Sequence, residues 1–264
     1  MKKYFLVAKN TWDEMLTYRL NFTMWRLRGI ISLVSIYFLW LAVIPNNGSV
    51  FGYNRSLILT YILGSSLVNS IIVSSRSYII GDEINQGNLS NFLIRPINYL
   101  MYWFAKDLGD KAMNILFSIF ELLILFLILR PPFFLQTNIS YLIPFFISIF
   151  LALFLNFFFN LLLGFIGFWS PEVWAPRFIF FMIESFLAGA YFPLDILPKP
   201  IFAVFQLLPF GYSLYFPLKV YLGQLSLTQI YFGLLISIVW VFGLLLIAQF
   251  VWTKGLKVYT AWGK

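Results

Sequence analysis

Two glutamates, Glu121 and Glu184, lie inside apolar segments and are the ionisable groups best placed for chemistry in this sequence. An ionisable side chain in a bilayer costs several kcal/mol, so such residues normally face a helix bundle or a cavity. One interpretation places these acids on a substrate or proton path. The other is structural: each is protonated or hydrogen-bonded to a neighbouring span, for example the serine-rich segment 57–79. The sequence leaves both open.

Most other site chemistry is excluded, because the 264 residues contain no cysteine and no histidine. Thiolate or imidazole metal sites, cysteine nucleophiles and Ser-His-Asp triads all require these side chains. We therefore expect no catalytic residue and no metal site in this chain.

The composition predicts an all-α integral membrane protein with a single transmembrane domain, residues 1–264. Hydrophobic residues make up 61% of the chain and charged residues only 11%, whereas a soluble domain carries about 25% charged residues. So few charged residues cannot cover a water-exposed surface, and most of the surface must face lipid. The net charge of +8 is interpreted as a signal of membrane orientation rather than of nucleic-acid binding.

Hydropathy predicts six transmembrane helices, at 22–44, 57–79, 112–129, 141–168, 178–192 and 229–252. Arg26 and Arg28 begin the first, where we expect them to reach the lipid headgroups. The second is rich in glycine and serine and is expected to face protein, because small residues let helices approach closely.

Two further segments are predicted to be helical without crossing the membrane. Residues 1–20 place Phe5, Trp12 and Met15 at helical spacing, which favours an amphipathic helix lying at the interface. Residues 193–225 hold five of the twelve prolines, so no single helix can run through them. We expect short re-entrant helices there, on the extracellular side.

Counting basic residues orients the chain. With six spans, fourteen of the eighteen lysines and arginines fall on the side of the two termini. Since cytoplasmic loops carry the excess of basic residues, both termini and residues 81–111 are predicted to be cytoplasmic.

Residues 81–111 are interpreted as a docking surface for a cytoplasmic partner. We predict a short helix over 83–93 with Leu89, Phe92 and Leu93 on one face, ended at Arg95-Pro96 because a residue before proline disfavours the helical conformation. A second amphipathic piece, 103–111, then leads into the third span. The alternative is a solvated connector, but connectors are usually shorter and lack apolar residues at helical spacing.

The pattern Glu83-x-x-x-Gly87-x-Leu89 followed by Arg95-Pro96, directly after the second span, resembles the coupling-helix region of ABC-2 type permeases. The segments YRLNFTMWRLR and RPINYLMYWFAKDLGDK resemble one bacterial subfamily of these proteins. The resemblance covers essentially the whole chain. It implies that six residues couple this chain to an ATPase: Asp82, Glu83, Gly87, Leu89, Arg95 and Pro96.

The resemblance also implies the partners and the location. A dimer of permease subunits, homo- or heterodimeric, would export substrates from a bacterial cell membrane, driven by a cytoplasmic ABC ATPase dimer. This sequence contains no G-x-x-x-x-G-K-[ST] motif. ATP and Mg²⁺ are therefore expected on the partner ATPase, and no cofactor is expected in this chain. Membrane lipids are expected to surround the chain.

Three alternatives remain at this point. The first is a permease for polysaccharide or teichoic-acid chains, which has a similar size and topology. The second is a membrane-embedded lipid-modifying enzyme, against which stands a predicted outer side with Asp195 as its single acid. The third is a passive membrane scaffold, against which the polar segment 81–111 argues.

Overall fold

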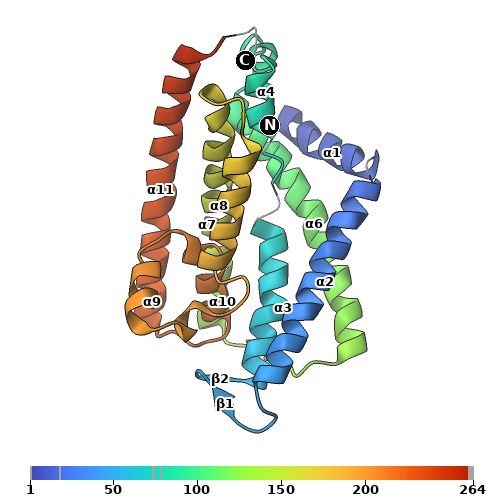
Figure 1. Cartoon of the computed structure of the whole chain (residues 1–264), viewed down its shortest axis with the longest axis vertical. Helices are drawn as coiled ribbons and strands as arrows, with labels where there is room; N and C mark the ends of the chain where they lie inside the picture. The colour runs from blue at the N-terminus through green and yellow to red at the C-terminus, as the bar shows by residue number, and fades with distance from the viewer. Residues whose placement is uncertain (1, 18, 73–74, 78, 261–264) are drawn as a thin grey trace.

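The computed structural model describes residues 2–17, 19–72, 75–77 and 79–260 and is built almost entirely from helices (Figure 1). The elements are α1 (Lys2–Thr17), α2 (Arg19–Val43), β1 (Ser49–Val50), β2 (Tyr53–Asn54), α3 (Arg55–Ile72), α4 (Ile79–Asn85), α5 (Ser90–Leu93), α6 (Tyr99–Leu129), α7 (Ile139–Phe165), η1 (Ile166–Phe168), α8 (Trp174–Leu187), η2 (Leu194–Ile196), α9 (Lys199–Phe205), η3 (Phe210–Tyr212), α10 (Tyr215–Tyr221) and α11 (Leu227–Val258).

The long helices run between two ends of the molecule. One, called here the terminal end, holds α4 and both ends of the chain (Figure 1). The other, called the hairpin end, holds the antiparallel β1–β2 hairpin together with α9 and α10. The two termini lie at the same end of the molecule, as the sequence predicted; which side of a membrane this end faces stays a prediction.

Within the described residues, five helices are long and apolar enough to cross a membrane: Phe22–Val43, Arg55–Ile72, Tyr99–Leu129, Ile139–Phe168 and Leu227–Val258. They correspond to five of the six predicted spans. The predicted span 178–192 falls on α8, which has 14 residues where about 20 are needed to cross the hydrocarbon core. The helix stops at Leu187 because Gly189 adopts a left-handed conformation (φ +81°) and Pro193 follows.

The second span was predicted to face protein, and this is confirmed. Half of its apolar window is buried inside the molecule, compared with 11% for α6. The side chains of Ile58, Leu59 and Tyr61 are fully buried in a core cluster that α2, α3 and α10 share. The helix is shorter than expected, however, since α3 ends at Ile72 rather than at residue 79.

Two predictions for 81–111 were wrong in detail. The single helix over 83–93 is two helices, α4 and α5, separated by a turn in which Gly87 has a φ of +74°. The segment 103–111 is not a separate amphipathic piece but part of α6, which begins at Tyr99. Asn98 caps α6 by accepting a hydrogen bond from the Met101 N–H. The predicted end of the earlier helix before Arg95-Pro96 is confirmed, since α5 stops at Leu93.

The helix α1 packs along α6 at the terminal end. Gly109 makes this contact possible: a Cβ at that position would lie 2.6 Å from the Ala8 carbonyl oxygen. The Trp12 indole N–H donates to the Gly109 carbonyl oxygen at 2.7 Å. Met15 is buried, whereas Phe5 is 73% exposed. The residues predicted to share one apolar face therefore divide between α6 and the surface.

Candidate functional site

The six residues predicted to couple this chain to an ATPase lie at the terminal end but have different surroundings. The first group, Asp82, Arg95 and Pro96, is exposed. Ile94, which directly precedes Arg95, is 83% exposed and was not singled out from the sequence. The guanidinium of Arg95 lies over the Phe92 ring, 6.0 Å from its centroid. These side chains are accessible at the surface of the terminal end.

The other three predicted residues, Glu83, Gly87 and Leu89, point inward. Leu89 is fully buried, and so cannot lie on a docking face with Leu93, which is half exposed. Glu83 accepts a hydrogen bond from the Tyr99 hydroxyl at 2.8 Å. Burial raises the pKa of the Glu83 carboxyl above its ordinary value, opposed by this hydrogen bond and by the charge of Lys106.

The helix α4 is seated on the rest of the bundle. It packs against α7 and η1, with Ile80 and Ile84 buried in the same core cluster as Phe165 and Phe168. The Asn85 side-chain amide donates to the Pro171 carbonyl oxygen at 2.9 Å. Movement of α4 would therefore be felt directly by α7 and by the loop that precedes α8.

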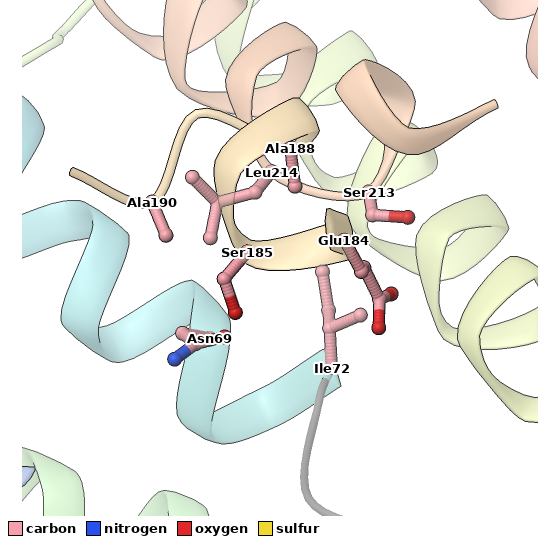
Figure 2. Close-up of a pocket in the computed structure, with 8 residues that line it drawn as sticks. All are labelled: Asn69, Ile72, Glu184, Ser185, Ala188, Ala190, Ser213 and Leu214. Atoms are coloured by element: carbon pink, nitrogen blue, oxygen red, sulfur yellow. The ribbon is translucent and has the colours of Figure 1, made fainter. Parts of the chain in front are cut away.

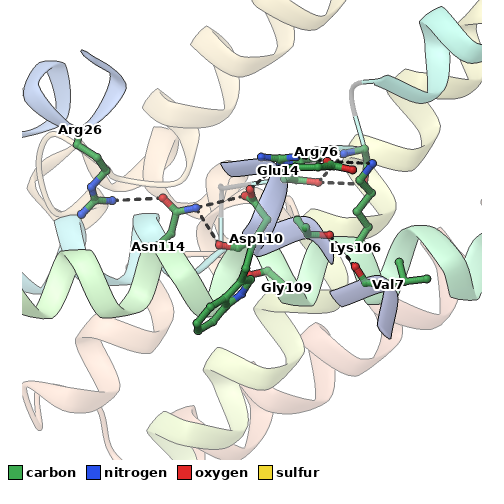
Figure 3. A network of polar contacts seen from close by, with 12 residues as sticks. Val7, Glu14, Arg26, Arg76, Lys106, Gly109, Asp110 and Asn114 are labelled. Atoms are coloured by element: carbon green, nitrogen blue, oxygen red, sulfur yellow. Dashed lines mark hydrogen bonds and ion pairs between the residues drawn. The ribbon is translucent and has the colours of Figure 1, made fainter. Parts of the chain in front are cut away.

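A polar network follows one face of α6 from the terminal end into the bundle (Figure 3). Arg76, in the loop after α3, donates to Glu14 of α1 at 2.6 Å and to Asp110 of α6 at 3.1 Å. One helical turn further on, the Asn114 amide donates to the Asp110 carbonyl oxygen at 3.0 Å. The Arg26 guanidinium continues the network, at 3.4 Å from the Asn114 side-chain oxygen.

Glu121 is the last member of this network. Arg26 of α2 donates through Nε to Glu121 Oε1 at 2.7 Å, and a second nitrogen contacts the other carboxylate oxygen. Arg26 also donates to the Ser118 hydroxyl at 2.8 Å. The prediction that Arg26 reaches the headgroups was wrong, because its guanidinium forms an ion pair with Glu121 inside the bundle. Arg28 is exposed, as expected, and lies over the Trp25 ring at 5.3 Å.

Glu184 has different surroundings. It is 4% exposed and accepts one hydrogen bond, from the Asn156 amide at 3.1 Å. Asn156 in turn accepts from Asn160 at 2.9 Å. The carboxylate borders a cavity of about 10 Å³, which Asn69, Ser185 and Ser213 also line (Figure 2). This is about the space that one water molecule needs.

The cavity wall contains an unsatisfied polar atom. Ser213 is 2% exposed, and its hydroxyl oxygen has no hydrogen-bond partner among the described residues. A buried hydroxyl without a partner costs free energy, so a water molecule in the cavity would stabilise the arrangement. The site fits a water or another molecule of that size; it does not fit a large substrate.

A second polar cluster lies at the hairpin end. The Lys219 ammonium of α10 donates to Asp195 at 2.8 Å, to Tyr53 at 2.9 Å and to Gln224 at 2.6 Å. The Tyr53 hydroxyl donates to the other Asp195 oxygen at 2.9 Å. All three Lys219 hydrogens thus have partners within the chain, which ties the hairpin to the proline-rich segment 193–225.

Within the part of the chain that the structure describes, no three histidine, cysteine, aspartate or glutamate side chains come together as metal ligands would. Glu184 faces an amide and Glu121 a guanidinium. The arrangement can therefore bind helices together and hold a water molecule.

Comparison with protein families identifies the class. The chain belongs to a family of transporter membrane proteins: the model described as ABC-2 family transporter protein matches residues 30–263. The resemblance drawn from the sequence is thereby confirmed, and the protein is a multi-pass membrane subunit of a transporter. No curated protein matches the chain.

Proposed function

We propose that this chain is the permease subunit of an ABC exporter, works as a dimer of permease subunits and is driven by a separate cytoplasmic ATPase dimer that binds ATP and Mg²⁺. The observation that carries the proposal is the coupling region, residues 79–98. Its interior is fixed against α7 through Ile80 and against the loop before α8 through Asn85, while Ile94 and Arg95 are left exposed. Such a surface suits a soluble partner whose motion must reach the bundle.

The topology of the proposal has six passes, with α8 as the fifth and shortest. The chain runs from the terminal end to the hairpin end in α2 and α6, and back in α3, α7 and α11 (Figure 1). Since α8 leads away from the terminal end and α9 lies at the hairpin end, the segment from α8 to α9 makes the fifth pass and brings the total to six. The terminal end would then be cytoplasmic, in a bacterial cell membrane.

The charges support this orientation. Basic residues at the hairpin end are few, namely Arg55, Arg130, Lys199 and Lys219. The terminal end carries most of the others, as expected of a cytoplasmic side. The segment 193–225 would then be an extracellular re-entrant segment, and α1 would lie at the cytoplasmic interface with Phe5 toward lipid.

The two intramembrane acids receive different roles in this proposal. Glu121 braces α2 against α6 through Arg26 and is structural. Glu184 lies beside the cavity at the contact of α3 and α8, where a water molecule would complete its hydrogen bonds. Neither acid is proposed to carry protons, since the ATPase supplies the driving force.

The partner can be tested by purification. The affinity-tagged chain is isolated from native membranes, and the proteins recovered with it are identified by mass spectrometry. We expect a chain with a Walker A motif, recovered in amounts close to those of the permease and lost in the double variant Ile94→Ser/Arg95→Ala. The control is Asn47→Ala, at an exposed position of the hairpin end. Absence of an ATPase, or full recovery in the double variant, would contradict the proposal.

The orientation has its own test, which the cysteine-free sequence makes simple. Single cysteines replace Asn88 or Asn47, and intact cells are treated with a membrane-impermeant maleimide. We expect labelling at 47 and none at 88 until the membrane is opened. Labelling of both positions from the same side would contradict the proposed topology.

A further inference from the structure

The last long helix reaches the turn of the coupling region. Tyr259 directly follows α11, and its hydroxyl donates to the Gly87 carbonyl oxygen at 2.6 Å. The same hydroxyl accepts a hydrogen bond from the Ser90 backbone N–H at 3.0 Å. The first peptide group lies in the turn between α4 and α5, and the second lies where α5 begins. One side chain from the far end of the sequence therefore closes this turn.

Leu89 anchors this turn by packing into the core cluster. Among the described residues, few hydrogen bonds tie the turn to the long helices. Within the turn, the Gly87 carbonyl oxygen also accepts from the Ser90 hydroxyl at 2.7 Å and weakly from the Ser90 N–H at 3.3 Å. These bonds shape the turn but join it to no other element. Among the described residues, the hydrogen bonds that connect Gly87 and Ser90 to another helix are those of Tyr259.

A second contact joins the same end of α11 to α4. Trp252 lies seven residues before Tyr259, and the rings of both residues contact Phe168. The Trp252 ring stacks on Tyr99 with the centroids 5.1 Å apart and the planes at 13°. The Tyr99 hydroxyl donates to Glu83. The end of α11 therefore holds α4 and the turn together.

The other end of α11 contacts the segment at the hairpin end. Gly233 lies so close to α10 that a Cβ there would be 2.2 Å from the Phe216 ring. The first turn of α11 is fixed by a capping box between Ser226 and Gln229. With 32 residues at 1.5 Å each, the helix is about 48 Å long. One continuous helix thus touches the coupling turn and α10.

We infer that Tyr259 is a positioning residue of the coupling region, and that α11 carries displacements of this region to α10 at the hairpin end. Tyr259 acts through Gly87 and Ser90 rather than by contact with nucleotide. The inference rests on the proposed function, because it needs an ATPase that moves the coupling region. It adds a route through Tyr259 to α11, beside the connections along the chain to α3 and α6.

The test removes one hydroxyl. Tyr259→Phe keeps the aromatic ring and loses both hydrogen bonds, and the matched control is Tyr231→Phe, a 64% exposed tyrosine of the same helix. A nitroxide on a single cysteine at Asn88 reports the mobility of the turn in nanodiscs. ATP hydrolysis is measured on the complex co-purified with each variant.

For Tyr259→Phe we expect a more mobile label and a fall in ATP hydrolysis of about tenfold, as two ordinary hydrogen bonds would give, while the amount of bound ATPase stays unchanged. Tyr231→Phe should match the unsubstituted chain in all three measurements. An unchanged label would overturn the inference, as would a mobile label with unchanged hydrolysis, because the contact would then be merely structural. Failure of the unsubstituted chain to bind an ATPase would overturn the proposed function, and the label would still decide whether Tyr259 holds the turn.

Discussion

The two ends of the molecule carry similar polar side chains and use them in opposite ways. At the hairpin end, Lys219 finds three hydrogen-bond acceptors within the chain and is almost fully buried. At the terminal end, Asp82, Ile94 and Arg95 stay exposed. The difference teaches that polarity alone does not mark an interaction surface. What marks it is a polar segment whose interior is fixed in the bundle and whose outer side chains stay exposed.

The largest effect on stability is expected at the hairpin end. Lys219→Met leaves the Asp195 carboxylate without its cation, and breaking a buried ion pair in this way costs about 3 kcal/mol. Thermal unfolding of the purified protein measures the loss. The control is Lys199→Met, an exposed lysine of α9, which should change stability by less than about 0.5 kcal/mol. Equal effects of the two substitutions would show that the ion pair of Lys219 with Asp195 does not stabilise the hairpin end.

A smaller effect is expected inside the terminal end. In Gly109→Ala the new Cβ would lie 2.6 Å from the Ala8 carbonyl oxygen, so α1 must move away from α6, at a cost of about 2 kcal/mol. The control is Gly29→Ala, because nothing lies within 4 Å of the added Cβ, and alanine should slightly stabilise α2 there. Hydrogen exchange in α1 should rise in the first variant alone. Unchanged exchange would contradict the packing of α1 on α6.

Glu83→Gln should have a still smaller effect that depends on pH. Because burial raises the pKa of this carboxyl in the folded protein, the stability that protonated Glu83 provides is lost as the pH rises through that raised pKa. Glutamine can still accept from Tyr99 and has no charge to bury. Relative to the original chain, the variant should therefore gain thermal stability as the pH rises above about 4, the ordinary range of a carboxyl pKa. Equal pH dependence of the two thermal midpoints would contradict this.

The smallest effect on stability is expected at the exposed tip. Ile94 is 83% exposed, so Ile94→Ser should leave the thermal midpoint almost unchanged, within about 0.5 kcal/mol. The matched substitution Ile84→Ser, at a buried position of α4, should destabilise the protein by several times as much. A large loss of stability in Ile94→Ser would mean that the tip is held within the chain, and the contrast between the two ends would fail.

Much of the fold could be predicted because membrane helices are set by local composition. The long apolar runs of α2, α7 and α11 fix their existence and approximate length. The break between α4 and α5 was missed because helical spacing was given more weight than Gly87, whose left-handed φ ends the helix. The shortness of α8 was missed for a similar reason: apolar residues continue past Gly189 after the helix has stopped.

The site was predictable only in outline. The polar segment 81–96 can be recognised from its composition, but its contacts depend on residues far away in the sequence. Tyr259 lies 172 positions from Gly87, and Arg26 lies 95 positions from Glu121. No local periodicity encodes such pairs. An arginine and a glutamate, each in an apolar helix, could still have been paired in advance, because a charge in lipid needs a partner.

The central claim is that the terminal end docks a separate ATPase. The most direct measurement places a benzophenone on a single cysteine at Ile94, or at Asn47 as the control, and irradiates membranes in which the native partners are present. We predict a cross-linked product between position 94 and a chain with a Walker A motif, and none from position 47. No ATPase adduct from position 94, or equal adducts from both positions, would contradict the claim.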